Sequence, residues 1–259
     1  MKRLLPISLS CLLLSVSPVL MAVDPPPKLA VDLAGNGQAQ TYTVELKRPD
    51  PDSNFESAVL KAGKTSITLE KDFTGYTVSL EAFRISGDSP ARVLVVSAEG
   101  ESDFIVRLFF VMVNGQLKQV GKIQGQGDIK VPGNSTVVST SWMGFWMKTE
   151  KHVFSKDLAL TLLPQEFYSL GIDATSGIEG TVVDSFPVYQ TREGKAVLAN
   201  TRKDSKFHVL LWDPSSAKPG DDIEARSRQW YLIRTESGFT GWVRAKHLEM
   251  EFSTLPWAG

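Results

Sequence analysis

Residues 229–248, QWYLIRTESGFTGWVRAKHL, decide the fold of the C-terminal part of this chain. The run from Trp230 to Arg234 has the aromatic and branched composition of a strand, and Gly241-Trp242-Val243 has the same character. Between them, Glu236-Ser237-Gly238 is typical of a turn, and residues 245–248 have room for one turn of helix. The stretch therefore predicts an antiparallel hairpin closed by a short helix.

The sequence before this hairpin supplies further strand candidates at 180–183, 187–189 and 207–212. Together these segments, about residues 177–252, resemble a bacterial Src-homology-3-like domain, a small β-barrel that binds ligands. The family usually shows Asn-Val-Arg after its first strand, whereas this chain has Val188-Tyr189-Gln190. The resemblance implies binding rather than catalysis, with cell-wall peptide as the usual ligand. We expect residues 178–252 to fold alone.

Two aromatic residues, Tyr189 and Trp230, fall near the positions with which members of that family line their ligand groove. Side chains alternate along a strand, so Trp230 and Tyr231 must face opposite sides of the sheet, and only one of them is available to a ligand. We expect Trp242, which follows Gly241 in an inner strand, to lie in the core. Tyr189 and Trp230 are therefore candidate ligand-binding residues.

The segment Asp213–Arg228 is longer than the corresponding family turn. It carries both signs of charge and two prolines, which is typical of a solvated loop. Such a loop could cover or extend a groove. It could equally be a tolerated surface insertion, because the entropic cost of closing a loop grows slowly with its length.

A second aromatic group, Trp142-Met143-Gly144-Phe145-Trp146-Met147, concentrates large side chains in six residues. If exposed, these side chains would form an adhesive apolar patch, which makes Trp142 and Trp146 candidate ligand-binding residues. The alternative is ordinary core packing where strands cross, because aromatic residues dominate cores as well.

Residues 41–170 are predicted to form an all-β domain. No segment has sustained helical periodicity, and strand-like runs are separated by Gly, Pro, Asn or Asp. Asn114-Gly115 between two such runs is the strongest hairpin signal, because both central turn residues need positive φ. A helical turn at 164–170 is expected to end the domain. The strand-like runs are 41–46, 66–70, 76–83, 92–98, 104–113, 117–123, 136–140 and 158–163.

Two loops in this domain weakly resemble the calcium-binding loops of FG-GAP propeller blades. They begin at Asp32 and at Ile85, and each is followed by a strand. Each loop keeps too few carboxylates for calcium, which prefers six or more oxygen ligands, so ordinary turns are the simpler reading. The repetition favours an antiparallel sandwich or a partial stack of blades, since the segment is too short for a closed propeller.

The N-terminus has the pattern of a secretion signal. Lys2 and Arg3 precede an apolar run, and Ala22 is placed for cleavage, so residues 1–22 are predicted to be removed. The alternative is a membrane anchor, which the prolines and serines within the run disfavour. Residues 23–40 are then a polar linker. We expect a periplasmic or secreted protein without an integral membrane span after cleavage.

The composition argues against several kinds of functional site. Cys11, the single cysteine, lies within the expected signal, so the mature protein would lack both disulfides and a thiol nucleophile. The near-balance of 28 basic and 29 acidic residues gives no reason to expect a nucleic-acid partner. His152, His208 and His247 are isolated from one another and from other metal-ligand types, so neither a metal site nor a cofactor is predicted.

These observations favour a non-enzymatic envelope protein with two β domains. The expected function is attachment to cell-wall peptide or peptidoglycan, or to an envelope protein, through the C-terminal domain. The leading alternative is a dedicated protein partner, as for an immunity or inhibitor protein that blocks a secreted enzyme. A third alternative, an enzyme with dispersed carboxylates, needs no local motif and stays open.

Overall fold

A computed structural model of the chain describes residues 25–50, 53–171, 177–217 and 227–257. The predicted all-β class is confirmed, because the described residues form four antiparallel sheets and only single turns of 3-10 helix. The expected signal peptide lies outside the described residues. No helix among those described is long and apolar enough to cross a membrane.

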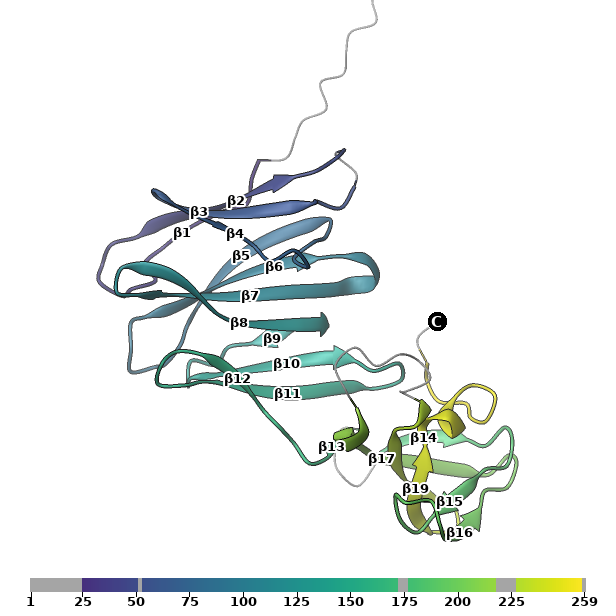
Figure 1. The fold of residues 1–259 in the computed structure, drawn as a ribbon. Coiled ribbons are helices and arrows are strands. Elements are labelled where there is room, and N and C mark those ends of the chain that lie inside the picture. Colours follow the sequence, from purple (N-terminus) through teal and green to yellow (C-terminus); the bar gives the residue numbers. More distant parts are fainter. Residues whose placement is uncertain (1–24, 51–52, 172–176, 218–226, 258–259) are drawn as a thin grey trace, which may run out of the picture.

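The first three sheets are consecutive four-stranded meanders, in which each strand pairs with the next along the chain. Figure 1 shows them stacked one above another, from the purple first sheet to the teal third sheet. The first contains β1 (Lys28–Val31), β2 (Gln40–Lys47), β3 (Ser57–Ala62) and β4 (Thr65–Thr68). The second contains β5 (Thr77–Arg84), β6 (Arg92–Glu99), β7 (Phe104–Val113) and β8 (Gln116–Gln126). The third contains β9 (Ile129–Lys130), β10 (Thr136–Trp142), β11 (Met147–Phe154) and β12 (Leu160–Leu163).

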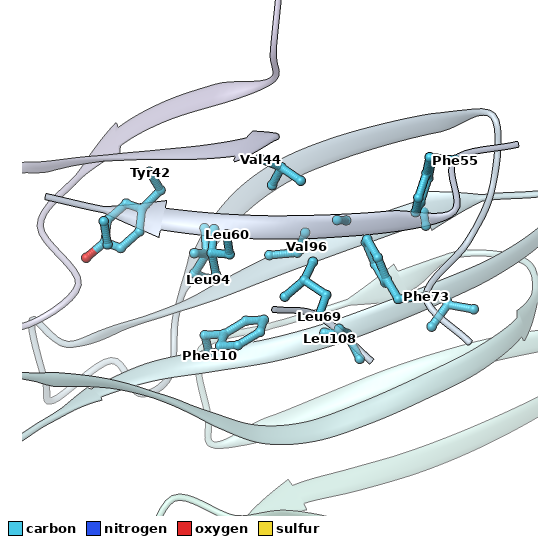
Figure 2. Close-up of a cluster of buried hydrophobic side chains, with 14 of the residues drawn as sticks. Tyr42, Val44, Phe55, Leu60, Leu69, Phe73, Leu94, Val96, Leu108 and Phe110 are labelled. Carbon is cyan, nitrogen blue, oxygen red and sulfur yellow. The ribbon is translucent and has the colours of Figure 1, made fainter. Parts of the chain in front are cut away.

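Two apolar clusters hold this stack together, one on each face of the second sheet. The first cluster joins it to the first sheet and includes Tyr42, Leu60, Leu94, Val96 and Phe110, which Figure 2 shows between the strands. The second cluster joins it to the third sheet. The middle strands of the second sheet are therefore buried on both sides, which explains why β7 is apolar except at Arg107.

Local turn chemistry follows the sequence closely at the β7–β8 hairpin. Asn114 and Gly115 have φ values of 51° and 76°, as the Asn-Gly pair predicts. Two other expectations differ from the structure. Residues 28–31 of the expected linker pair with β2 as strand β1, and the expected helical turn at 164–170 instead contains the short strand β13 (Tyr168–Ser169).

The C-terminal sheet has seven strands in the order β13-β17-β18-β19-β15-β16, and β14 also pairs with β17. Its pairings do not close it into a barrel. The hairpin predicted from residues 229–248 is present as β18 and β19, followed by the 3-10 turn η3 (Ala245–Leu248). The strands are β14 (Ile178–Thr181), β15 (Pro187–Tyr189), β16 (Val197–Asn200), β17 (Lys206–Asp213), β18 (Trp230–Thr235) and β19 (Thr240–Arg244). Two further 3-10 turns are η1 (Glu101–Asp103) and η2 (Pro214–Ser216).

The core of the C-terminal sheet extends beyond residues 178–252. The turn between β10 and β11, residues 143–146, inserts Phe145 and Trp146 into this core, and we call this turn the hairpin tip. Tyr168 and Leu170 from the segment after the third sheet join them, as does Leu255. The third sheet and the C-terminal sheet therefore share one apolar cluster, and a fragment of residues 178–252 would lack five of its buried side chains.

Candidate functional site

The β18–β19 hairpin separates the C-terminal sheet into a core face and an exposed face. Tyr231 is paired with Val243 on the core face, whereas Trp230 is paired with Arg244 on the other. Tyr231 and Val243 belong to the buried cluster. The prediction that Trp230 and Tyr231 face opposite sides is therefore confirmed. We call the face that carries Trp230, Leu232, Trp242 and Arg244 the outer face.

Trp242 lies on the outer face and is only partly buried, so its predicted place in the core is wrong. Gly241 and Val243, its neighbours in β19, face inward instead. Gly241 is required by the close crossing of β15, because a Cβ there would lie 2.6 Å from both Val188 Cγ1 and the Tyr189 carbonyl oxygen. The glycine thus allows the paired strands β15 and β19 to approach closely, and the tryptophan beside it is partly exposed.

An arginine organises one half of the outer face. The Arg192 Nη1 atom lies 2.6 Å from Asp213 Oδ2, an ion pair in which the carboxylate is buried and the guanidinium is 42% exposed. The Arg192 Cζ atom also lies 5.4 Å from the centroid of the Trp242 ring and 5.5 Å from that of Phe167. The two rings are 5.9 Å apart. Cation, carboxylate and aromatic surfaces therefore meet at one place.

Asp213 and Arg192 stabilise each other's charged forms. Burial alone raises the pKa of Asp213, but hydrogen bonds from Arg192 and from the Ser215 backbone N–H outweigh it and lower the pKa below its usual value. The same hydrogen bond from Arg192 to Asp213 raises the pKa of the guanidinium. Asp213 thereby holds the Arg192 guanidinium in position near the Trp242 and Phe167 rings.

The other half of the outer face is a stack around Trp230. The Arg244 Cζ atom lies 3.7 Å from the Trp230 ring centroid, and the Tyr189 ring meets Trp230 edge-on at 5.8 Å. Gly194, in the turn between β15 and β16, also lies against the indole. These neighbours leave Trp230 only 5% exposed, whereas Tyr189 is partly exposed. Trp230 therefore lies beneath the surface, and the partly exposed side chains of Tyr189 and Arg244 form the part that contacts solvent.

The aromatic run at 142–147 is divided between two environments. Trp146 is buried in the C-terminal core, 5.8 Å from Trp212 and 6.5 Å from Tyr168 between ring centroids. Trp142 is partly exposed and paired with the exposed Met147 at the end of the third sheet. Trp146 is therefore a core residue, as the alternative of ordinary core packing predicted. Trp142 lies apart from the cluster around Trp230 and Trp242.

The histidines have structural surroundings. His247 stacks on Phe186 and meets Phe252 edge-on, and burial lowers its pKa to about 4. Burial also lowers the pKa of His152. Within the described ranges, no group of three or more His, Cys, Asp or Glu side chains could hold a metal ion. In the loop that begins at Asp32, the carboxylate accepts backbone hydrogen bonds from Gly35 and Gly37, as in an ordinary turn.

Sequence reasoning missed four members of the outer-face cluster, namely Phe167, Arg192, Asp213 and Arg244. Phe167 lies before β13, in the helical turn expected at 164–170 and outside the expected domain of residues 177–252, and no strand pattern marks it. Asp213 was assigned to the solvated loop, yet its side chain is 1% exposed. A useful signal was Asp-Pro-Ser after an apolar strand, because Asp213 caps the turn η2 through Ser215.

Comparisons with known proteins give no assignment. No protein-family model matches the chain, and no curated protein matches it significantly.

Proposed function

We propose that this chain binds cell-wall peptidoglycan through the outer face of its C-terminal sheet, as a non-enzymatic envelope protein exported to the periplasm or beyond. The observation that carries the proposal is the position of Trp242. It lies outside the core, against Phe167 and beneath the Arg192 guanidinium, with solvent on its free side. The resemblance of residues 177–252 to Src-homology-3-like domains supports the same class of ligand.

The chemistry of the surface suits a glycopeptide. Aromatic rings provide large rigid contact areas at low cost in side-chain entropy, and they suit the apolar faces of sugars. Peptidoglycan stems carry carboxylates, which arginine binds through paired hydrogen bonds. Arg192 and Arg244 each lie over an aromatic ring, so two fixed cations accompany two aromatic surfaces on one face.

Co-sedimentation with purified peptidoglycan tests this proposal. Trp242→Ala and Tyr189→Ala should each weaken binding at least tenfold, with little change in thermal stability, because both rings are partly exposed. Phe239→Ala is the matched control, since that ring is 49% exposed in the β18–β19 turn, at the end of the hairpin away from the cluster. Equal retention of all three variants, or no sedimentation of the unmodified protein, would refute the assignment.

The alternative is a dedicated protein partner, such as a secreted enzyme that the chain inhibits. The length of the Asp213–Arg228 segment favours this alternative, although residues 218–226 lie outside the described residues. Shortening that segment separates the two proposals. A specific protein interface should lose affinity with the loop, whereas a general cell-wall surface should keep most of it.

A further inference from the structure

A groove of about 420 Å³ lies far from the outer face, between the second and third sheets. Strands β5, β6 and β7 form its floor, and β9 with the preceding Asp128 forms the opposite wall. The third sheet packs over β8, where Gly121 and Gly125 lie against Leu160 and Ser141, and its Val137 and Phe154 also join the second cluster with residues of β6 and β7. The groove occupies the part of this face that Thr77, Glu81, Glu99 and Arg107 line.

The groove follows β5, which is an edge strand. It is lined by residues of β5 from Thr77 to Phe83, a length of roughly 20 Å at the usual rise per residue. Within the sheet, β5 pairs with β6 alone, so its other edge has no strand partner among the described residues. An unpaired edge beside a groove is the arrangement that accepts an added strand.

A buried cation lies in the floor of the groove. Arg107 is only 6% exposed, and among the described residues its guanidinium makes one hydrogen bond, 2.6 Å long, to the Gly127 carbonyl oxygen. Burial lowers the pKa of Arg107, and the nearby Asp128, Glu81 and Glu99 counter that effect. No carboxylate among the described residues lies within ion-pair distance of it. Its remaining N–H groups can therefore donate to an acceptor in the groove.

The charged residues that line the groove indicate which class of ligand it would bind. The three carboxylates around the buried guanidinium outnumber it, and Lys130 is the single further cation that lines the groove among the residues that the structure describes. An anion would meet this acidic rim, whereas a peptide with basic side chains would complement it. The length along β5 also suits an extended segment of about six residues better than a compact molecule.

We propose that the groove binds an extended peptide with alternating basic side chains, added as a strand to the free edge of β5. The alternate side chains of such a strand project on the groove side, toward Glu81, Glu99 and Asp128, as the two-residue period of a strand requires. The inference is independent of the proposed peptidoglycan surface, which lies on another sheet.

A synthetic probe tests the proposal with the full-length chain. The probe is the fluorescein-labelled peptide Thr-Lys-Val-Lys-Val-Lys-Thr, followed by anisotropy, with a Glu-for-Lys version as the charge control. We expect the basic peptide to bind and the acidic one to bind at least tenfold more weakly. Replacing both Glu81 and Glu99 by Gln should weaken binding of the basic peptide at least tenfold. Glu45→Gln is the matched control, because Glu45 is an exposed acid of the first sheet paired with Lys61.

Backbone methylation separates strand addition from charge attraction alone. Two further probes carry N-methyl groups on alternate residues, one set on each edge of the peptide. Strand addition predicts that one methylated probe loses binding and the other keeps it, because only one edge of the peptide donates to β5. Equal binding of both methylated probes, equal effects of the groove and control variants, or no binding of the basic peptide at 1 mM would each overturn the proposal. Thermal unfolding of each variant establishes that it is folded.

Discussion

Removing the ring of Phe145 should destabilise the C-terminal sheet, although this residue lies in a turn of the third sheet. The side chain is 3% exposed, and its ring lies 4.9 Å from the Trp257 ring and 5.7 Å from the Tyr231 ring between centroids. Truncating a buried phenylalanine to alanine costs about 3–5 kcal/mol. Because the hairpin tip can partly collapse into the cavity, we expect about 3 kcal/mol for Phe145→Ala.

Urea unfolding measures this change, with tryptophan fluorescence reporting on the C-terminal core. The matched control is Trp142→Ala, which removes a larger ring from the same hairpin. Trp142 lies outside the shared cluster and is partly exposed, so the control should lose under about 1 kcal/mol. For a chain of this length, a loss of 3 kcal/mol corresponds to a decrease of roughly 10 °C in the melting temperature.

Equal losses in the two variants would refute the reasoning, because the hairpin tip would then contribute nothing to the C-terminal core. The expected result has a consequence for fragments. Residues 178–252 expressed alone lack the hairpin tip, Tyr168 and Leu170, so their thermal transition should be broad or absent.

Four further outcomes are expected. Trp242→Ala should lower the free energy of unfolding, measured in urea, by less than about 1.5 kcal/mol, because the ring is partly exposed. A loss near 4 kcal/mol would indicate that the ring is buried in the core. The folded-state pKa of His247, about 4, lies below its usual 6.5, so stability falls as the pH drops from about 6.5 to 4. His247→Phe should remove up to about 3 kcal/mol of that dependence, and an unchanged slope of stability against pH would contradict it. Gly241→Ala should lower the melting temperature markedly, because the added Cβ meets Val188 and backbone, whereas an unaltered value would contradict the close crossing. The exported protein should have an intact mass that corresponds to a start near Val23, and a full-length chain in the membrane fraction would indicate an anchor.

The candidate site was only partly predictable. Alternation within β18 placed Trp230 and Tyr231 on opposite faces, because the two-residue period of a strand is a local property. Which face is covered depends on distant segments, so the position of Trp242 after Gly241 in an inner strand did not reveal that its ring lies on the outer face. Arg192 and Phe167 join Trp242 from elsewhere in the chain, and no spacing in the sequence connects these three residues.

The sequence by itself determined the all-β class, most strand positions and the Asn114-Gly115 turn, because side-chain period and turn chemistry act over a few residues. Only the tertiary structure decided that three meanders stack through two apolar clusters and that the C-terminal sheet stays open. It also decided that the hairpin tip completes a core some 30–110 residues further along the chain. The physical reason is that burial is a property of the assembled molecule: a ring such as that of Phe145 is buried by partners that adjoin it only after folding.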